Sequence, residues 1–149
     1  MTVIDLPDAN ATERFGRSLA PALRPGDVVA LSGPLGAGKT SLCRGLLHGL
    51  GVEGEVASPT FPIVQPYEPP DARLPVWHVD LYRIEDPDEL EELGLGDALV
   101  DAALLIEWPE RLPRLWDHAL RLTIRPELTG GRSLTAQVPL AWEGRWPPR

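Results

Sequence analysis

The sequence has very little of several features that assign proteins to classes. Its 149 residues include one cysteine, Cys43, which excludes an internal disulfide and is typical of a small buried apolar position. No apolar run approaches the roughly 20 residues that cross a membrane, and the N-terminus shows no basic and then apolar signal segment. No spacing of cysteine and histidine indicates zinc. We therefore expect a cytoplasmic protein without membrane contact.

Positive charge is also scarce. The chain has 14 lysines and arginines together against 22 aspartates and glutamates, which gives a formal net charge of −8. Tight direct binding of nucleic acid depends on neutralising phosphates, and no basic patch stands out in the sequence. The stretch from Glu85 to Asp101 is strongly acidic, which is more typical of a solvated helix face than of a docking site. We expect any nucleic acid to be held by partner proteins.

One glycine-rich segment, Gly33 to Thr40, matches the phosphate-binding loop pattern of glycine, four residues, glycine, lysine and then serine or threonine. An apolar run precedes it and a helix-like segment follows, which is the context that this loop requires. Glycines allow backbone N–H groups to converge on an anion, and the helix dipole adds positive potential. Lys39, the only lysine of the chain, is expected to reach the β- and γ-phosphates, and the Thr40 hydroxyl to bind Mg²⁺. The nucleotide-binding residues expected from the loop are Gly33, Leu35, Gly36, Ala37, Gly38, Lys39, Thr40 and Ser41.

Apolar runs and amphipathic segments predict strands and helices around this loop. Continuous apolar runs are typical of parallel strands that are covered on both faces. The first helix is expected to begin with Asn10 as its N-cap and Glu13 as the capping partner, and to end near Pro25. The predicted strands are 28–31, 63–67, 74–80 and 103–107, and the other predicted helices are 40–50 and 86–94.

The C-terminal part alternates between apolar and polar residues on either side of Gly130–Gly131, which predicts an antiparallel hairpin. The fold class expected from these elements is α/β. We predict a three-layer, P-loop NTPase-like fold with a mixed, mostly parallel sheet, helices on both faces and this C-terminal hairpin. No linker or internal repeat is evident, so residues 1–149 are expected to form a single P-loop ATPase domain, with 145–149 as a frayed tail.

The choice of nucleotide depends on motifs that are missing. Guanine-specific members of the loop class carry an Asn-Lys-x-Asp motif, but Asn10 is the only asparagine and the only lysine belongs to the loop. No Asp-x-x-Gly switch motif and no ABC-type signature is present, and no segment resembles the arginine-bearing lid of small-molecule kinases. ATP is therefore favoured over GTP.

Hydrolysis of ATP needs acids that support Mg²⁺ and a group that orients water. Asp80 and Glu107 each end an apolar strand, and ligands of parallel sheets bind at the carboxyl ends of strands. The alternative is that each acid is simply exposed to solvent at the end of its strand. Thr60, in a proline-rigid loop, is either a switch-like hydroxyl or an ordinary loop threonine, and His78 is more often a hydrogen-bonded core residue than a catalyst. Trp108 is either a packed aromatic or a stacking surface.

Four segments of the sequence occur in the order seen in one protein family. They are Gly-Pro-Leu-Gly-Ala-Gly-Lys-Thr, Ser-Pro-Thr-Phe, His-Val-Asp-Leu-Tyr-Arg and Ile-Glu-Trp-Pro-Glu. From about Leu6 to Arg132 the chain resembles the TsaE (YjeE) family. The resemblance implies a P-loop fold with a mixed sheet and an ATPase that is weak alone. It also implies TsaD- and TsaB-type partners, with which the family serves the transfer of threonylcarbamoyl to adenosine 37 of tRNA.

The resemblance also implies roles for single residues. Lys39 and Thr40 match phosphate and metal positions, Asp80 and Glu107 match acids tied to Mg²⁺ and hydrolysis, and Thr60 matches a switch-like threonine. Positions near the nucleotide or a partner are matched by Trp108 and Arg132, and a segment that borders the base is matched by Asp8 and Thr12. The family often has an acid where this chain has Pro34. Two alternatives to an ATPase subunit are a nucleotide-dependent assembly module with incidental hydrolysis and a small-molecule kinase.

Overall fold

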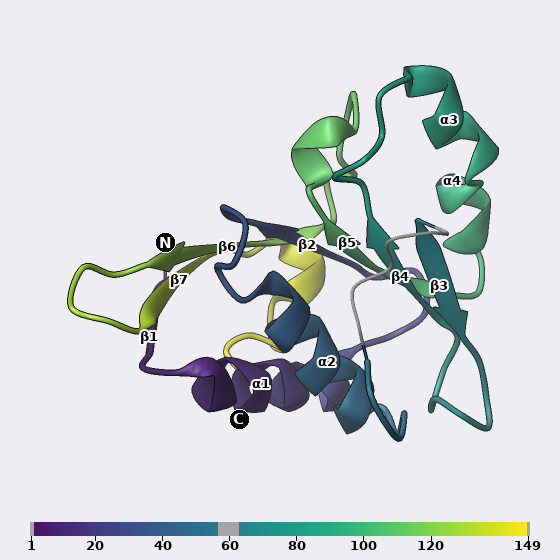
Figure 1. The fold of residues 1–149 in the computed structure, drawn as a ribbon. Helices are drawn as coiled ribbons and strands as arrows, with labels where there is room; N and C mark the ends of the chain where they lie inside the picture. The colour runs from purple at the N-terminus through teal and green to yellow at the C-terminus, as the bar shows by residue number, and fades with distance from the viewer. Residues whose placement is uncertain (1, 57–62, 149) are drawn as a thin grey trace.

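The computed structural model describes residues 2–56 and 63–148, which form one continuous sheet with helices on both of its faces (Figure 1). The strands are β1 (Thr2–Leu6), β2 (Val28–Ser32), β3 (Val64–Tyr67), β4 (Val76–Asp80), β5 (Ala103–Glu107), β6 (Leu120–Pro126) and β7 (Arg132–Gln137). The α-helices are α1 (Ala9–Leu19), α2 (Lys39–Gly49), α3 (Pro87–Glu92) and α4 (Leu95–Ala98), and the 3₁₀ turns are η1 (Ala20–Ala22), η2 (Pro109–Arg111) and η3 (Leu140–Trp142).

The sheet is mixed, as predicted. Its strand order is β1-β7-β6-β2-β5-β4-β3, with β2 parallel to both β5 and β6 and with β4 parallel to β5. Strands β6 and β7 form the predicted antiparallel hairpin, and β1 and β3 add antiparallel edges. Because β1 is antiparallel to β7 and β7 to β6, strand β1 points the same way as β2, β4, β5 and β6. The edge strand β1 was not among the predicted elements.

The two faces of the sheet carry separate apolar clusters. On β5 the side chain of Leu105 packs in the cluster that includes residues of α1 and α2, whereas Leu104 and Ile106 pack in the cluster that includes residues of α4. All of β5 is buried, which explains its continuous apolar sequence. Figure 1 shows α1 and α2 below the sheet and α3 and α4 above it. The prediction of helices on both faces is therefore confirmed.

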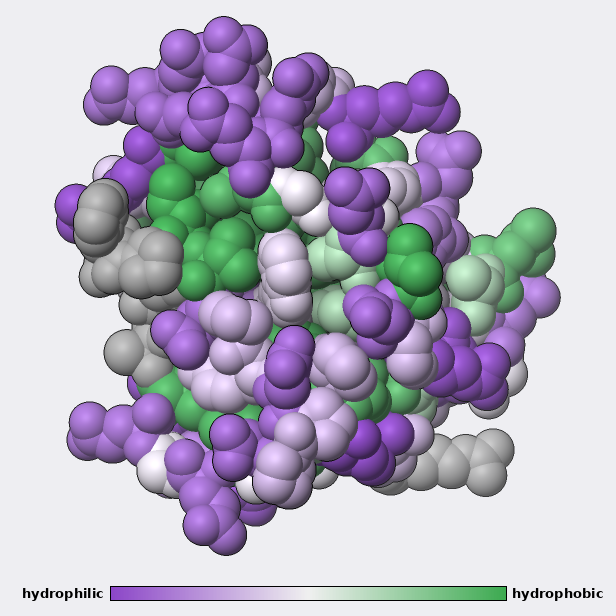
Figure 2. All heavy atoms as spheres, turned by 90° about the vertical axis from the view of Figure 1, so that its right-hand side faces the viewer, coloured by the Kyte–Doolittle hydropathy of each residue, from purple (hydrophilic) through white to green (hydrophobic). Residues whose placement is uncertain are grey.

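The acidic stretch forms α3 and α4 and their flanking turns. Helix α3 begins after Asp86, whose carboxylate accepts a hydrogen bond from the N–H of Asp88, and none of its residues is buried. Figure 2, which views the right-hand side of Figure 1, shows hydrophilic side chains across the top of the molecule, where α3 lies. Much of this stretch is therefore solvated helix surface. No helix among the described residues combines the length and the apolar character that crossing a membrane requires.

Two details of the predicted helices are wrong. Helix α1 begins at Ala9 with Asp8 as its N-cap instead of Asn10, and the Asp8 carboxylate accepts the N–H of Ala11 at 2.7 Å. Both residue types cap helices well, and the extended backbone of Asp8 after Pro7 lets its carboxylate reach the first turn. Glu13 does not act as the capping partner and contacts Nδ1 of His48 at 3.2 Å.

Glycines bring α1 and α2 into close contact. A Cβ on Gly16 would lie 2.1 Å from the carbonyl oxygen of Leu42, and a Cβ on Gly45 would lie 1.9 Å from the carbonyl oxygen of Glu13. These two positions therefore have no room for a side chain, and the backbones of the two helices pack directly together. Since α2 carries the predicted phosphate-binding loop at its N-terminus, this packing fixes the direction in which the loop points.

We predict that Gly45→Ala destabilises the fold by about 1–3 kcal/mol, because its methyl group would force α1 and α2 apart. Gly96→Ala is the matched control, since Gly96 also lies in a helix but a Cβ there would meet nothing within 4 Å. This control is expected to stabilise the fold by roughly 0.5–1 kcal/mol. Urea unfolding measures both values, and equal stabilities for the two variants would contradict the packing argument.

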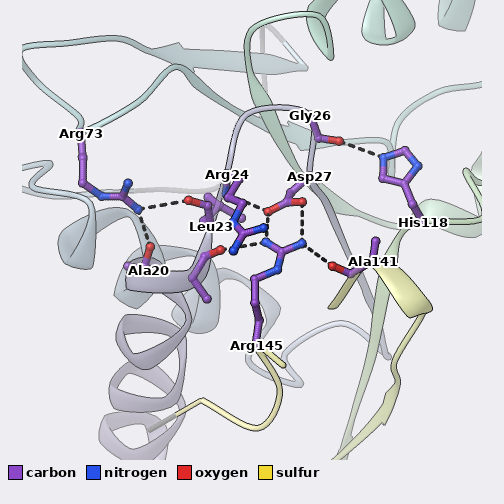
Figure 3. A network of polar contacts seen from close by, with 10 residues as sticks. Ala20, Leu23, Arg24, Gly26, Asp27, Arg73, His118, Ala141 and Arg145 are labelled. Atoms are coloured by element: carbon purple, nitrogen blue, oxygen red, sulfur yellow. Dashed lines mark hydrogen bonds and ion pairs between the residues drawn. The ribbon is translucent and has the colours of Figure 1, made fainter. Parts of the chain in front are cut away.

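The expectation of a frayed tail over 145–149 is wrong for Arg145 and Trp146. Figure 3 shows the Arg145 guanidinium between Asp27 and Ala141, with hydrogen bonds of 2.6 and 3.1 Å to the Asp27 carboxylate. Asp27 is only 6% exposed, and a buried carboxylate needs such a partner. Trp146 packs edge-on against Phe15 at 5.9 Å between ring centroids. The tail is therefore attached near the start of β2 and to α1.

Candidate nucleotide site

A cleft of about 410 Å³ lies at the carboxyl ends of β4 and β5 and at the N-terminus of α2. This is the edge of a parallel sheet at which ligands usually bind. Its lining combines the predicted loop, both predicted acids and several cations. The lining residues are Leu35, Gly36, Gly38, Lys39, Thr40, Ser41, Asp80, Tyr82, Arg83, Glu107, Trp108 and Arg132.

The loop between β2 and α2 depends on glycine at two positions. Gly33 has a φ of 147°, and a Cβ there would lie 2.3 Å from the carbonyl oxygen of Ile124. Gly38, at a φ of 110°, precedes the first helical residue, and a Cβ there would lie 2.7 Å from Nη1 of Arg132. Among the described residues no side chain caps α2. The first N–H groups of the helix therefore suit an anion in the cleft.

Lys39 lies at the base of the cleft and is 5% exposed. Its ammonium donates a hydrogen bond to the carbonyl oxygen of Gly33 and lies 3.7 Å from the centroid of the Trp108 ring. Burial lowers the pKa of Lys39 from its ordinary value, and the negative potential of Glu107 and neighbouring acids opposes that shift. The buried cation is thus held by a carbonyl, a ring face and nearby acids, in a position that can also serve a phosphate.

The two acids lie side by side on adjacent strands. Asp80 and Glu107 are partners in the parallel ladder of β4 and β5. The Thr40 hydroxyl donates to Glu107, at 3.2 Å from Oε1 and 3.4 Å from Oε2. Nε2 of His78 lies 2.7 Å from Glu107 Oε2, and Asp80 Oδ1 accepts the N–H of Tyr82 at 3.0 Å. A hydroxyl and two carboxylates are the hard oxygen ligands that Mg²⁺ prefers, so this donor set fits that ion.

Trp108 forms one wall of the cleft, beside Lys39 and Tyr82. It has a φ of 63°, and no other described residue except glycine has a positive φ. This left-handed turn directly after β5, stabilised by a hydrogen bond from its N–H to the carbonyl oxygen of Leu31 at 3.2 Å, brings the indole over Lys39. The Tyr82 ring lies 4.9 Å from it, centroid to centroid.

Arg132, at the start of β7, reaches the cleft from the hairpin. Its Nη1 donates a hydrogen bond to the Thr12 hydroxyl at 3.2 Å and lies beside Gly38. Thr12 is fully buried, and its hydroxyl also donates to the carbonyl oxygen of Asp8 at 3.2 Å. Asp8 and Thr12 do not line the cleft, because Asp8 caps α1 and Thr12 lies behind Arg132. Their link to the cleft is the hydrogen bond to Arg132.

The structure thus gathers most of the predicted site residues in one place. Gly33 and Ala37 do not line the cleft, although Gly33 accepts the Lys39 hydrogen bond, and Thr60 lies outside the described residues. Pro34 lies in the loop, where its carbonyl oxygen accepts the N–H of Ala37 at 3.1 Å.

Two cleft residues were missed by the sequence reasoning. Tyr82 and Arg83 line the cleft directly after β4. Both residues belong to the His-Val-Asp-Leu-Tyr-Arg segment, two and three positions after Asp80. That segment could have indicated them as site residues.

The matching family model and the named relatives agree on one family. Residues 6–134 match the family described as threonylcarbamoyl adenosine biosynthesis protein TsaE. A relative from Streptomyces coelicolor, named tRNA threonylcarbamoyladenosine biosynthesis protein TsaE, is 49% identical over 112 residues, covering 74% of this chain and 76% of its own. A relative of the same name from Synechocystis is 46% identical over 114 residues, covering 74% and 71%. The crystal structure of YdiB from Bacillus subtilis aligns over 91% of this chain and 83% of its own, with a TM-score of 0.70 and 29% identity.

Proposed function

This chain belongs to the TsaE family of threonylcarbamoyl adenosine biosynthesis proteins, and from that membership we propose that it binds and hydrolyses ATP with Mg²⁺ as an accessory subunit. This ATP hydrolysis would support the transfer of threonylcarbamoyl to adenosine 37 of tRNA. The observation that carries the proposal is the convergence of Lys39, Thr40, Asp80 and Glu107 in one cleft at the end of a phosphate-binding loop.

Each group in the cleft has a proposed task. The loop N–H groups and Lys39 would bind the phosphates, and Thr40, Asp80 and Glu107 would hold Mg²⁺. The bound ion supplies neutralisation of charge on the phosphate oxygens. Arg132 beside Gly38 and Arg83 at the rim add positive potential where negative charge would develop.

Glu107 is the group proposed to orient and deprotonate the attacking water. Glu107 is 2% exposed, and its carboxylate is held by hydrogen bonds from His78 and Thr40, so its position is fixed before a nucleotide arrives. Trp108 lines the same cleft, with its ring 3.7 Å from the Lys39 ammonium. A fixed acceptor in a sheltered site is the arrangement that general-base chemistry needs.

The proposal includes partners of the TsaD and TsaB type, with tRNA contacted through them. The net charge of −8 supports indirect contact, because a negative protein repels the tRNA backbone. The ammonium of Lys39 contacts the Gly33 carbonyl oxygen and the Trp108 ring, and it must give up these contacts to bind a phosphate. This cost is consistent with slow ATP hydrolysis by the chain without its partners. We place this activity in the cytoplasm with its tRNA substrate, and we propose ATP over GTP because the guanine motif is missing.

The test is reconstitution of tRNA modification with the partner pair, a threonylcarbamoyl donor, ATP and Mg²⁺, measuring the modified nucleoside by mass spectrometry. We expect many rounds of modification with the wild-type chain and about one round per complex when a non-hydrolysable ATP analogue replaces ATP. Equal multiple turnover with the analogue would contradict hydrolysis and favour an assembly module. Modification that does not depend on this chain at all would contradict the accessory role.

A further inference from the structure

We propose that His78 is a positioning residue whose Nε2–H fixes the Glu107 carboxylate toward Thr40 and the metal position. The inference deepens the proposed ATPase function and rests on it, since only a metal-binding or water-orienting carboxylate needs a fixed orientation. His78 does not line the cleft and would not touch the nucleotide.

The contact between the two side chains is short and fully enclosed. His78 Nε2 lies 2.7 Å from Glu107 Oε2, and the two residues are 0% and 2% exposed. This distance is typical of a hydrogen bond to a charged acceptor. A buried carboxylate without donors is costly, and the imidazole supplies a hydrogen-bond donor to the enclosed oxygen.

The hydrogen-bond pattern also assigns the tautomer of His78. An ionised carboxylate only accepts hydrogen bonds, so the contacting Nε2 must carry the proton. The opposite nitrogen, Nδ1, is buried and has no hydrogen-bond partner among the described residues. With the proton on Nε2, the buried Nδ1 has an unused lone pair and no unsatisfied N–H.

His78 and Thr40 lie nearest to different oxygens of the Glu107 carboxylate. Oε2 is held by His78, whereas the nearer oxygen to the Thr40 hydroxyl is Oε1, at 3.2 Å. Both His78 and Glu107 lie on central, parallel strands, in a ladder that pairs His78 with Leu105 and Asp80 with Glu107. Such strands hold side chains more rigidly than loops do. The imidazole therefore limits rotation of the carboxylate from behind, while Thr40 and Asp80 lie on its cleft side.

The simplest competing explanation is that His78 merely satisfies a buried polar contact and adds stability. Two amide variants separate the explanations. The amide nitrogen of glutamine lies near the position of histidine Nε2, whereas that of asparagine lies near Nδ1. His78→Gln therefore keeps a donor to Glu107, and His78→Asn keeps polarity but moves the donor away. Val76→Ala is the control for lost core packing, because Val76 is fully buried on the same strand and pairs with Ala103, at the other end of the ladder from Glu107.

The experiment measures phosphate release with the partner proteins, and ADP binding with and without Mg²⁺, for these variants. We expect His78→Asn to lower kcat by about 10–100-fold and to raise the Mg²⁺ concentration needed for half-maximal activity, as is typical when a ligand loses its supporting hydrogen bond. His78→Gln should keep kcat within about threefold of the wild type, and ADP affinity without Mg²⁺ should change by less than about twofold in both. Val76→Ala should lose stability and keep kcat.

A spectroscopic measurement tests the contact without any turnover. Side-chain ¹⁵N NMR of the nucleotide-free protein should show the His78 proton on Nε2. A proton on Nδ1, equal losses of kcat in the two amide variants, or the same loss in Val76→Ala would overturn the proposal. If the wild type does not hydrolyse ATP, the proposed function fails. The role of His78 is then still decided by the tautomer and by the effect of Mg²⁺ on ADP binding.

Discussion

Lys39→Ala is expected to weaken the binding of ATP by about 10³-fold, because truncating one member of a buried charge pair costs several kcal/mol. Lys39 is only 5% exposed in the cleft, where little water remains to screen its attraction for a phosphate. No other lysine exists in the chain, and the other cleft cations, Arg83 and Arg132, approach from different elements. Neither can replace a point charge at the start of α2.

Titration calorimetry with ATP and Mg²⁺ measures this effect. Arg114→Ala is the matched control for loss of one positive charge, because the Arg114 side chain is 82% exposed and lies outside the cleft. Its ATP affinity should stay within about twofold of the wild type, since exposed charges are screened. Lys39→Arg should not restore binding, because a planar fork does not fit the place of a compact ammonium. A loss of less than tenfold in Lys39→Ala would show that the phosphates bind elsewhere.

Glu107→Gln is expected to lower phosphate release by about 10²–10³-fold while ATP affinity changes only a few-fold, as is typical when a general base is removed. Glutamine has the shape of glutamate and keeps one oxygen to accept the His78 N–H, while its amide can donate to the Thr40 hydroxyl oxygen, but it cannot take a proton from water. The variant therefore removes the chemistry of the carboxylate and leaves the cleft largely intact. Asp80→Asn is a useful comparison, because Asp80 is the ladder partner of Glu107 and more exposed to solvent.

Single-turnover phosphate release and calorimetry on the same samples distinguish the roles of the two acids. If Glu107→Gln loses binding as completely as Lys39→Ala, then Glu107 acts only by holding the metal or the fold, and its proposed second role of orienting water is wrong. If Asp80→Asn loses hydrolysis and Glu107→Gln does not, the roles proposed for the two acids are exchanged.

Much of the fold could be predicted because the central strands are covered on both faces. Such strands give continuous apolar runs, so 103–107 was identified with the bounds that the structure shows. The acids that end two of these runs, Asp80 and Glu107, meet because carboxyl ends of parallel strands share one edge of the sheet. The C-terminal hairpin followed from alternation around a glycine turn.

The remaining features depend on register and on distant contacts. The hydrogen bond from His78 to Glu107 requires the alignment of β4 with β5, which no local pattern encodes. The local sequence around Arg145 is typical of a polar tail, because its buried partner Asp27 lies more than 100 positions away in the chain. Strand β1 is a short edge strand with one exposed side, and its pairing with β7 brings together the two ends of the sequence. The approach of Arg132 to Gly38 similarly follows from the hairpin topology.

Hydrolysis is tested most simply by measuring phosphate release from ATP by the wild-type chain, with Mg²⁺ and the partner pair, beside Glu107→Gln under the same conditions. We expect Mg²⁺-dependent release that the partners increase and that Glu107→Gln reduces by about 10²–10³-fold. Release that never exceeds background with the partners present, or that is equal in the wild type and Glu107→Gln, would show that this chain is not the proposed ATPase.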